Sequence, residues 1–101
     1  MNKSVYIHGY RLDLTCFACP EQYEVYDPQS VLVGYIRLRH GILKVHCPDI
    51  GGDVVYNVKT IGDGVFDIES GERLYHLTKS IEAIQAYTLR NIFKNIDYDS
   101  V

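Results

Sequence analysis

The sequence predicts an α+β domain: an antiparallel β-meander of five or six strands with a C-terminal helix packed on one face. Two observations carry this prediction. Over residues 1–69, apolar and polar residues alternate in short runs separated by turn residues. From Ser70 onward, the apolar residues recur at steps of three to four positions. Because the chain has 101 residues, we expect a single domain over residues 1–101.

Six strand-like runs precede the helix, and turn residues bound each of them. The dipeptide His40-Gly41 suits a two-residue hairpin, because Gly tolerates a positive φ and His is enriched there among other residues. Asp27-Pro28-Gln29-Ser30 suits a type I turn, with Asp first and Pro second. The predicted strands are 5–8, 10–14, 22–26, 31–39, 42–47 and 54–61.

The helix is predicted over residues 70–96. Ser70 is a suitable N-cap, and Glu72 complements the helix dipole in the first turn. The segment Gln85-Ala86 is a candidate kink, and residues 97–101 form an acidic tail that we expect to fray. The apolar positions that define the helical period are Leu74, Leu77, Ile81, Ile84, Leu89, Ile92 and Ile96.

The two-residue loop at His40-Gly41 fixes the pairing of the strands on either side of it. Arg39 then faces Ile42, and each further pair follows by one step in each direction. Side chains alternate across a strand, so one set points into the core: Ile36, Leu38, Leu43, Val45 and Cys47. The opposite face carries Tyr35, Arg37, Arg39, Lys44 and His46, which we call the basic strip.

The preceding turn extends both faces to the next strand. It places Val25 and Tyr23 beside Leu32 and Gly34 on the core face. Gln22 and Glu24 join the face that carries the basic strip.

Two interpretations of the basic strip are open. Arg37 directly opposite Lys44 is mildly unfavourable in a hairpin, which favours a docking face for an anion: a nucleotide, a nucleic-acid backbone or an acidic protein surface. Alternatively, the strip is a solvated face on which Glu24, diagonal to Arg37, screens the charge. We take the five residues as the candidate binding residues for a protein partner or a small anionic ligand.

The cysteines suggest a second hypothesis. Cys16 and Cys19 have the spacing of one zinc knuckle, and Cys47 begins a partial second knuckle in which Ile50 replaces the second Cys. A zinc-stabilised module with an incomplete two-knuckle site, built on Cys16, Cys19 and Cys47, is therefore the alternative to three reduced cysteines without a metal. A redox role is less favoured, because the CxxC segment leads into a strand and not a helix.

Other motifs are absent from the sequence. Aligning Gly64 with the glycine of a calcium loop puts Lys59 and Ile61 at ligand positions, which excludes that site. The Gly-rich segments 51–52 and 62–64 match no nucleotide fingerprint. No catalytic motif such as HExxH or GxSxG occurs, so we expect a non-enzymatic protein with no catalytic residues.

Composition and charge narrow the expected partners and location. The net charge of −3 argues against nucleic-acid binding over the whole surface. No apolar run is long enough for a membrane helix and the N-terminus lacks a signal-peptide segment, so we expect a cytoplasmic protein. Nine tyrosines, among them Tyr75 and Tyr87 in the helix, suit interfaces, and a homodimer is a further hypothesis. Compact acidic domains are frequent among phage products, so a binding or regulatory protein of phage or mobile-element origin is the leading interpretation.

Overall fold

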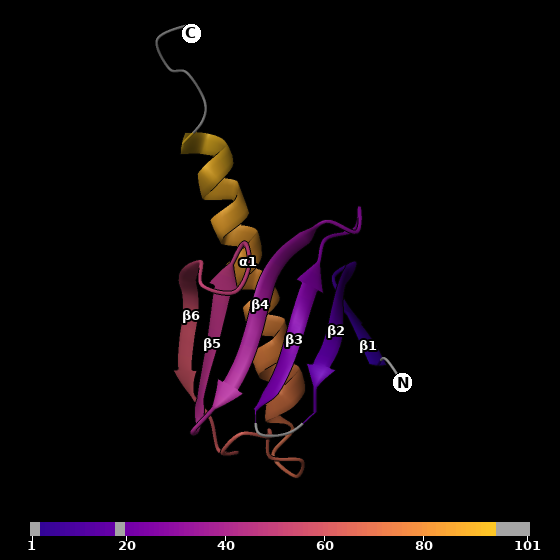
Figure 1. Cartoon of the computed structure of the whole chain (residues 1–101), viewed down its shortest axis with the longest axis vertical. Helices are drawn as coiled ribbons and strands as arrows, with labels where there is room; N and C mark the ends of the chain where they lie inside the picture. Colours follow the sequence, from indigo (N-terminus) through magenta and orange to yellow (C-terminus); the bar gives the residue numbers. More distant parts are fainter. Residues whose placement is uncertain (1–2, 18–19, 95–101) are drawn as a thin grey trace, which may run out of the picture.

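The computed structural model describes residues 3–17 and 20–94 of the chain. These residues form six antiparallel strands, one helix and the loops that connect them. The strands lie in sequence order, each paired with the next, and the helix follows the last strand (Figure 1). The α+β meander predicted from the sequence is therefore confirmed. The elements are β1 (Lys3–Ile7), β2 (Tyr10–Cys16), β3 (Glu21–Tyr26), β4 (Leu32–Arg39), β5 (Ile42–Cys47), β6 (Asp53–Lys59) and α1 (Glu72–Lys94).

The β4–β5 hairpin turns in two residues with positive φ, His40 at 54° and Gly41 at 71°. Both angles are those of the tight hairpin turns whose twist matches the strands. The pairing follows the prediction from Arg39 opposite Ile42 onward, and includes Arg37 opposite Lys44 and Tyr35 opposite His46. His8-Gly9, between β1 and β2, also has two positive φ angles, 52° and 82°.

The β3–β4 connection differs from the prediction in its register. The predicted type I turn is present, because the N–H of Ser30 donates to the carbonyl of Asp27 at 2.9 Å. Ser30 then adopts a φ of 64°, and the pairing shifts by one residue beyond it. Val25 therefore lies opposite Gly34 and Tyr23 opposite Ile36, in place of the predicted Leu32 and Gly34, and Leu32 lies opposite Tyr26. The extra residue is a β-bulge, which turn residues alone do not specify.

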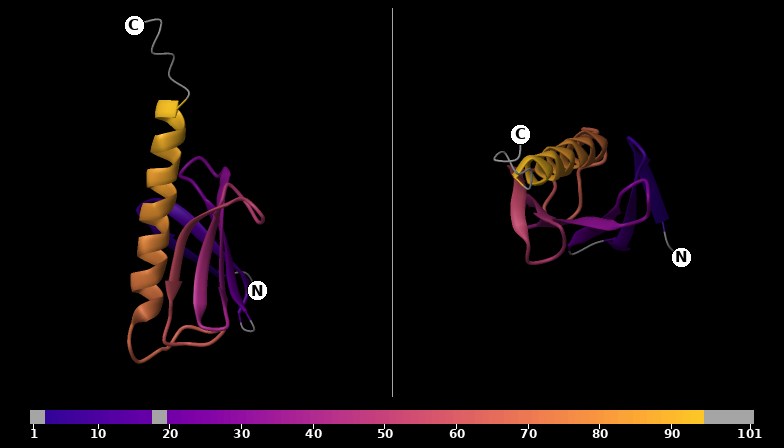
Figure 2. Two further views of the ribbon diagram at one scale, coloured as in Figure 1. Left: turned by 90° about the vertical axis from the view of Figure 1, so that its left-hand side faces the viewer. Right: turned by 90° about the horizontal axis from the view of Figure 1, so that it is seen from above.

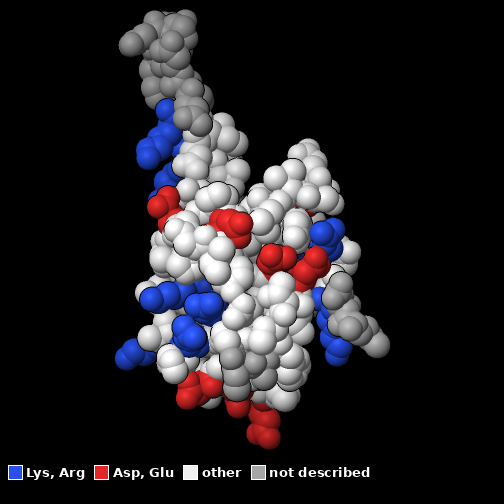
Figure 3. Space-filling view, in the orientation of Figure 1, with Lys and Arg blue, Asp and Glu red and all other residues white. Residues whose placement is uncertain are grey.

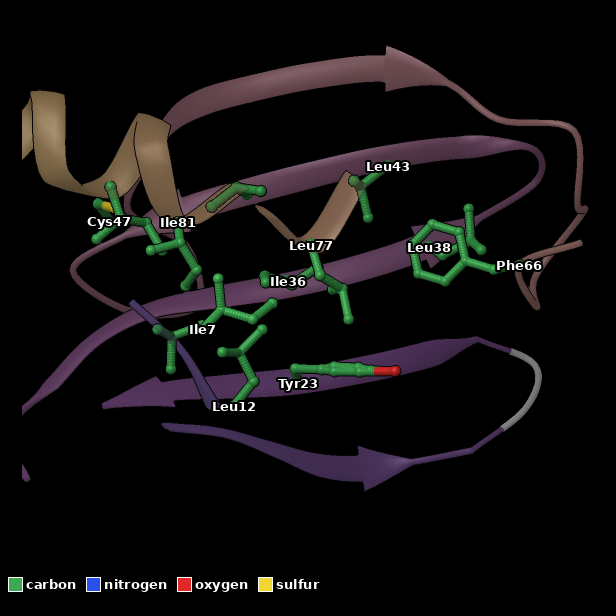
Figure 4. Close-up of a cluster of buried hydrophobic side chains, with 13 residues drawn as sticks. Ile7, Leu12, Tyr23, Ile36, Leu38, Leu43, Cys47, Phe66, Leu77 and Ile81 are labelled. Atoms are coloured by element: carbon green, nitrogen blue, oxygen red, sulfur yellow. The ribbon is translucent and has the colours of Figure 1, made fainter. Parts of the chain in front are cut away.

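The inner face of the sheet holds the core. Leu38, Leu43 and Val45 are fully buried there, as the alternation predicts, and Cys47 and Ile36 are almost so. Leu77, Ile81 and Ile84 of α1 pack against them (Figure 4). Figure 2 shows the sheet curving around the helix, which lies over β4, β5 and β6. The helix therefore supplies the second layer that an antiparallel sheet of this size needs.

Helix α1 runs without interruption, so the kink at Gln85-Ala86 is not present. Leu74, Leu89 and Ile92 are more than half exposed, although the helical period placed them with the core residues. A helix of 23 residues is about 34 Å long, whereas the 8 residues of β4 span about 26 Å. The C-terminal part of α1 thus extends past the sheet (Figures 1 and 2). Ile96 and the tail lie outside the described residues.

Glu72 holds the loop between β6 and α1. Its buried carboxylate accepts the backbone N–H groups of Ile61, Gly62 and Asp67 at 2.7–2.8 Å. Burial alone would raise the pKa of Glu72, but these three donors and His76 outweigh it and lower the pKa below its ordinary value. As predicted, Ser70 caps the helix, because its hydroxyl accepts the N–H of Glu72 at 3.2 Å.

A second buried carboxylate, Glu21 at the start of β3, ties the same loop to the sheet. It accepts two parallel hydrogen bonds from the guanidinium of Arg73, at 2.9 and 3.0 Å, and the N–H of Phe66 at 3.2 Å. The Tyr23 hydroxyl also donates to it. Burial, and then the adjacent Glu21, raise the pKa of Tyr23, and the hydrogen bonds to Glu21 raise the pKa of Arg73. The two carboxylates therefore fix where the helix starts relative to the sheet.

Replacing Glu72 by Gln should destabilise the protein by about 2–4 kcal/mol at pH 7, because an amide group would leave loop N–H donors unpaired. The folded pKa lies below the unfolded one, so the carboxylate stabilises the fold at pH values above the unfolded pKa, and this contribution is lost as the pH falls through the folded pKa. Urea unfolding from pH 7 to pH 3 should therefore show the gap between wild type and variant closing in acid. Glu69→Gln, at an exposed position, is the control. A constant gap would contradict the assigned role of the carboxylate.

The helix approaches the sheet closely at Gly34. A Cβ atom on Gly34 would lie 2.7 Å from Cδ1 of Ile84. Gly34→Ala should therefore cost about 1–3 kcal/mol of stability. Ile84→Val removes Cδ1, so the double variant should be more stable than the sum of the two single changes predicts, by about 1 kcal/mol. Ile81→Val, one turn away, should instead combine additively with Gly34→Ala in the same denaturation experiment.

Candidate functional site

The outer face of the sheet carries the basic strip in ordered rows. Arg37 and Lys44 lie side by side on β4 and β5, with Gln22 of β3 and Asn57 of β6 at either end of the row. Cross-strand neighbours on one face have Cβ atoms about 4.5–5.5 Å apart. The row therefore brings the two cations within reach of one small ligand and places an amide on either side of them.

Lys59 adds a cation that the sequence analysis missed. It lies opposite Ile42, which in turn lies opposite Arg39, so a second row of the outer face runs Arg39, Ile42, Lys59. The alternation of side chains along β6 could have placed Lys59 on the outer face. That placement requires the pairing of β5 with β6 across the loop at 48–52, and a bulge opposite Val45 and His46 shifts this pairing.

Four of the five basic-strip residues line one pocket of about 390 Å³. His40 and Ile42 complete its lining, and no described Asp, Glu, Ser, Thr or Cys is part of it. Figure 3 shows the Lys and Arg side chains gathered over β4, β5 and β6, away from the acidic groups over β2 and β3. We call this hollow the cationic pocket; it is lined by Arg37, Arg39, His40, Ile42, Lys44 and His46.

The cations of the pocket have no carboxylate partner among the described residues. The ion pairs of the described structure lie outside the pocket and involve other basic residues: Arg11, Arg73, His76 and Lys79. Glu24 lies opposite Tyr35 and diagonal to Arg37, but its carboxylate accepts from the Tyr26 hydroxyl at 3.1 Å. Screening by Glu24 therefore acts at a distance, and Arg37 is left without a direct counter-charge.

Tyr35 belongs to the outer face but is only 7% exposed. Its hydroxyl donates to the Oε1 of Gln22, and the guanidinium of Arg37 lies 5.9 Å from the centre of its ring. The buried Nε of Arg37 has no hydrogen-bond partner among the described residues. Tyr35 thus supports Arg37 and offers little surface of its own to a ligand.

His46 is oriented by the loop that follows β5. Its Nδ1 lies 3.2 Å from the carbonyl oxygen of Gly52, so an N–H at Nδ1 would donate to that oxygen. This contact leaves Nε2 as the nitrogen that is available to a ligand. On the other side, Asp63 and Gly64 share a smaller hollow of about 260 Å³ with Arg39 and His40. Asp63 makes no ion pair within 4.0 Å in the described structure.

The cysteines do not gather around one point. Cys16 is half-buried at the end of β2, whereas Cys47 is buried in the core at the end of β5, and Cys19 lies outside the described residues. Two strands separate β2 from β5, which puts Cys16 and Cys47 roughly 14 Å apart across the sheet. One zinc ion, with Zn–S bonds of about 2.3 Å, does not bridge them in this arrangement. Burial, and then Asp53, raise the pKa of Cys47 to about 11.

The other candidate surface is the helix. Tyr75 is exposed, with the ammonium of Lys79 5.7 Å from its ring centre, and Tyr87 donates to Asp53 at 2.9 Å. Leu89, Ile92 and Phe93 are exposed where α1 extends past the sheet. These groups lie away from the cationic pocket, on the side of the sheet that the helix covers.

Comparison with known proteins gives no family for this chain. Neither a protein-family model, nor a curated protein, nor a solved structure matches it. In the described part of the chain, α1 falls short of the apolar length needed to cross a membrane. Arguments about function therefore rest on the pocket itself.

Proposed function

We propose that this is a small non-enzymatic binding protein that uses the basic strip to hold an anionic group of a protein partner or a small ligand. The observation that carries the proposal is the cationic pocket, which has Arg37, Arg39 and Lys44 in its lining and no carboxylate from the part of the chain that the structure describes. Like charges directly opposite each other destabilise a hairpin. A sheet face shaped by stability alone would pair them with acidic neighbours, whereas an anionic ligand compensates them on binding.

The size of the positive area favours a compact anionic group. Asp13 and Glu24 occupy the same face on β2 and β3, next to the strip. An extended polyanion lying across the sheet would meet these carboxylates, and the net charge of −3 would oppose it further. A small anion, or an acidic group on a protein surface, avoids contact with these carboxylates and is less affected by the net charge.

The chemistry of the pocket lining favours binding over catalysis. Its polar groups are guanidinium, ammonium and imidazole, without a hydroxyl, thiol or carboxylate among the described residues that line it. Hydroxyl, thiol and carboxylate nucleophiles are therefore not available there, and the cations suit electrostatic binding of an anion. In this proposal Tyr35 does not contact the ligand; its ring packs against the guanidinium of Arg37 and positions that group.

The experiment is capture of partners from lysate with wild-type protein and with Arg37→Glu/Lys44→Glu. Both side chains point away from the core, so the variant should stay folded, with a modestly lower melting temperature because Arg37 no longer packs on Tyr35. Capture should be lost in the variant, and in the wild type it should weaken as salt is raised. Lys3→Glu/Arg90→Glu carries the same charge change at exposed positions outside the pocket and should retain capture. Salt-insensitive capture that survives the strip variant would contradict the proposal.

A further inference from the structure

The Nε–H of Arg37 is a donor whose requirement is not met within the described structure. It is buried, and no acceptor lies within hydrogen-bond distance. Buried donors in folded proteins nearly always have a partner, and an unpaired one costs roughly 1–3 kcal/mol. The guanidinium presents its donors as a rigid planar fork that matches two oxygens of one oxyanion. Because Nε exposes almost no surface, a ligand oxyanion reaches this donor when the Arg37 side chain shifts toward the pocket, and it then binds the Nε–H together with a neighbouring N–H.

The groups around Arg37 determine which oxyanion fits. Lys44 lies directly opposite it, and His46 and Arg39 line the same pocket. A carboxylate brings one negative charge and two oxygens, which the fork of Arg37 alone can saturate. A phosphoryl group brings close to two charges and three terminal oxygens, so that Arg37 and Lys44 can bind it together. The uncompensated charge of the row therefore matches a phosphoryl group better than a carboxylate.

We infer that the cationic pocket is a phosphoryl-binding site, with Arg37 as the bidentate anchor and Lys44 as the flanking cation. This deepens the proposed function and rests on it. The volume of about 390 Å³ falls at the lower end of the range for small-ligand pockets. The pocket thus has room for a phosphoryl group carried on a larger molecule, with the apolar side chain of Ile42 beside it.

Inorganic phosphate tests the group alone, added to the full chain while NaCl is adjusted to keep the ionic strength constant. In ¹H–¹⁵N spectra, the Nε–H resonance of Arg37 and the amides of residues 37, 44 and 46 should shift and saturate. Arg37→Lys keeps the charge but removes the fork, so affinity should fall roughly tenfold. Lys79→Gln, at a helix position far from the pocket, should not change the affinity. Asp63→Asn should leave the phosphate affinity unchanged or increase it, because this substitution removes a carboxylate that lies next to Arg39.

Two carriers distinguish the source of the phosphoryl group. O-phosphoserine represents a modified protein side chain and adenosine monophosphate a small phosphate ester; the tighter binder identifies the class. Equal shifts with chloride, or unchanged affinity in a folded Arg37→Lys variant, would overturn the inference. If phosphate fails while the captured partner still depends on Arg37 and Lys44, only the phosphoryl assignment falls. If capture also survives their reversal, the proposed function falls with it.

Discussion

The two-residue turn at His40-Gly41 is the constraint on which the two faces of the protein depend. Both residues have positive φ, so the chain reverses direction within two residues, and this fixes the pairing of β4 with β5. Because strand side chains alternate, a shift of one residue would exchange the two faces. Leu38 and Leu43 would then point to solvent, and Arg37 and Lys44 into the core. The hydrophobic layer under α1 and the cations of the outer face are therefore set by the same turn.

A second constraint acts from outside the hairpin. The helix packs mainly against β4, β5 and β6, and its start is fixed by Glu72 and Glu21, which bind the backbone of the loop at 61–67. Gly34 then lets Ile84 approach the sheet closely. With the inner face committed to the helix, β4 and β5 have only their outer face for contact with a ligand. The position of the cationic pocket is thus a consequence of how the core is closed.

The local parts of this structure could be predicted from the sequence, and the non-local parts could not. Alternation and the dipeptide His40-Gly41 are local signals, and they predicted β4, β5 and their register correctly. The turn residues Asp27 and Pro28 indicate neither the positive φ of Ser30 nor the register shift between Tyr26 and Val25. Leu89 and Ile92 follow the helical period, but whether they are buried depends on the length of the sheet beneath them. For this reason the helix was predicted and its exposed end was not.

The candidate site divides in the same way. Arg37, Arg39, Lys44 and His46 follow from one hairpin and were predicted as one face. Lys59 required the pairing of a third strand across a bulge, and the burial of Tyr35 required the side chains of Gln22 and Arg37. Glu21 and Glu72 are buried although Glu is rarely so, because loop N–H groups and, for Glu21, the side chains of Arg73 and Tyr23 satisfy their carboxylates.

The central claim, that the turn at His40-Gly41 separates a buried face from an accessible one, is tested most directly by thiol labelling. Lys44→Cys and Leu43→Cys place the probe on neighbouring residues, in chains where Cys16 and Cys19 are replaced by Ser. The native Cys47, buried and with its pKa raised to about 11, serves as the slow internal reference. Position 44 should label rapidly and position 43 as slowly as Cys47, at the rate of unfolding. Equal rates at the two positions, or faster labelling at position 43, would contradict the account.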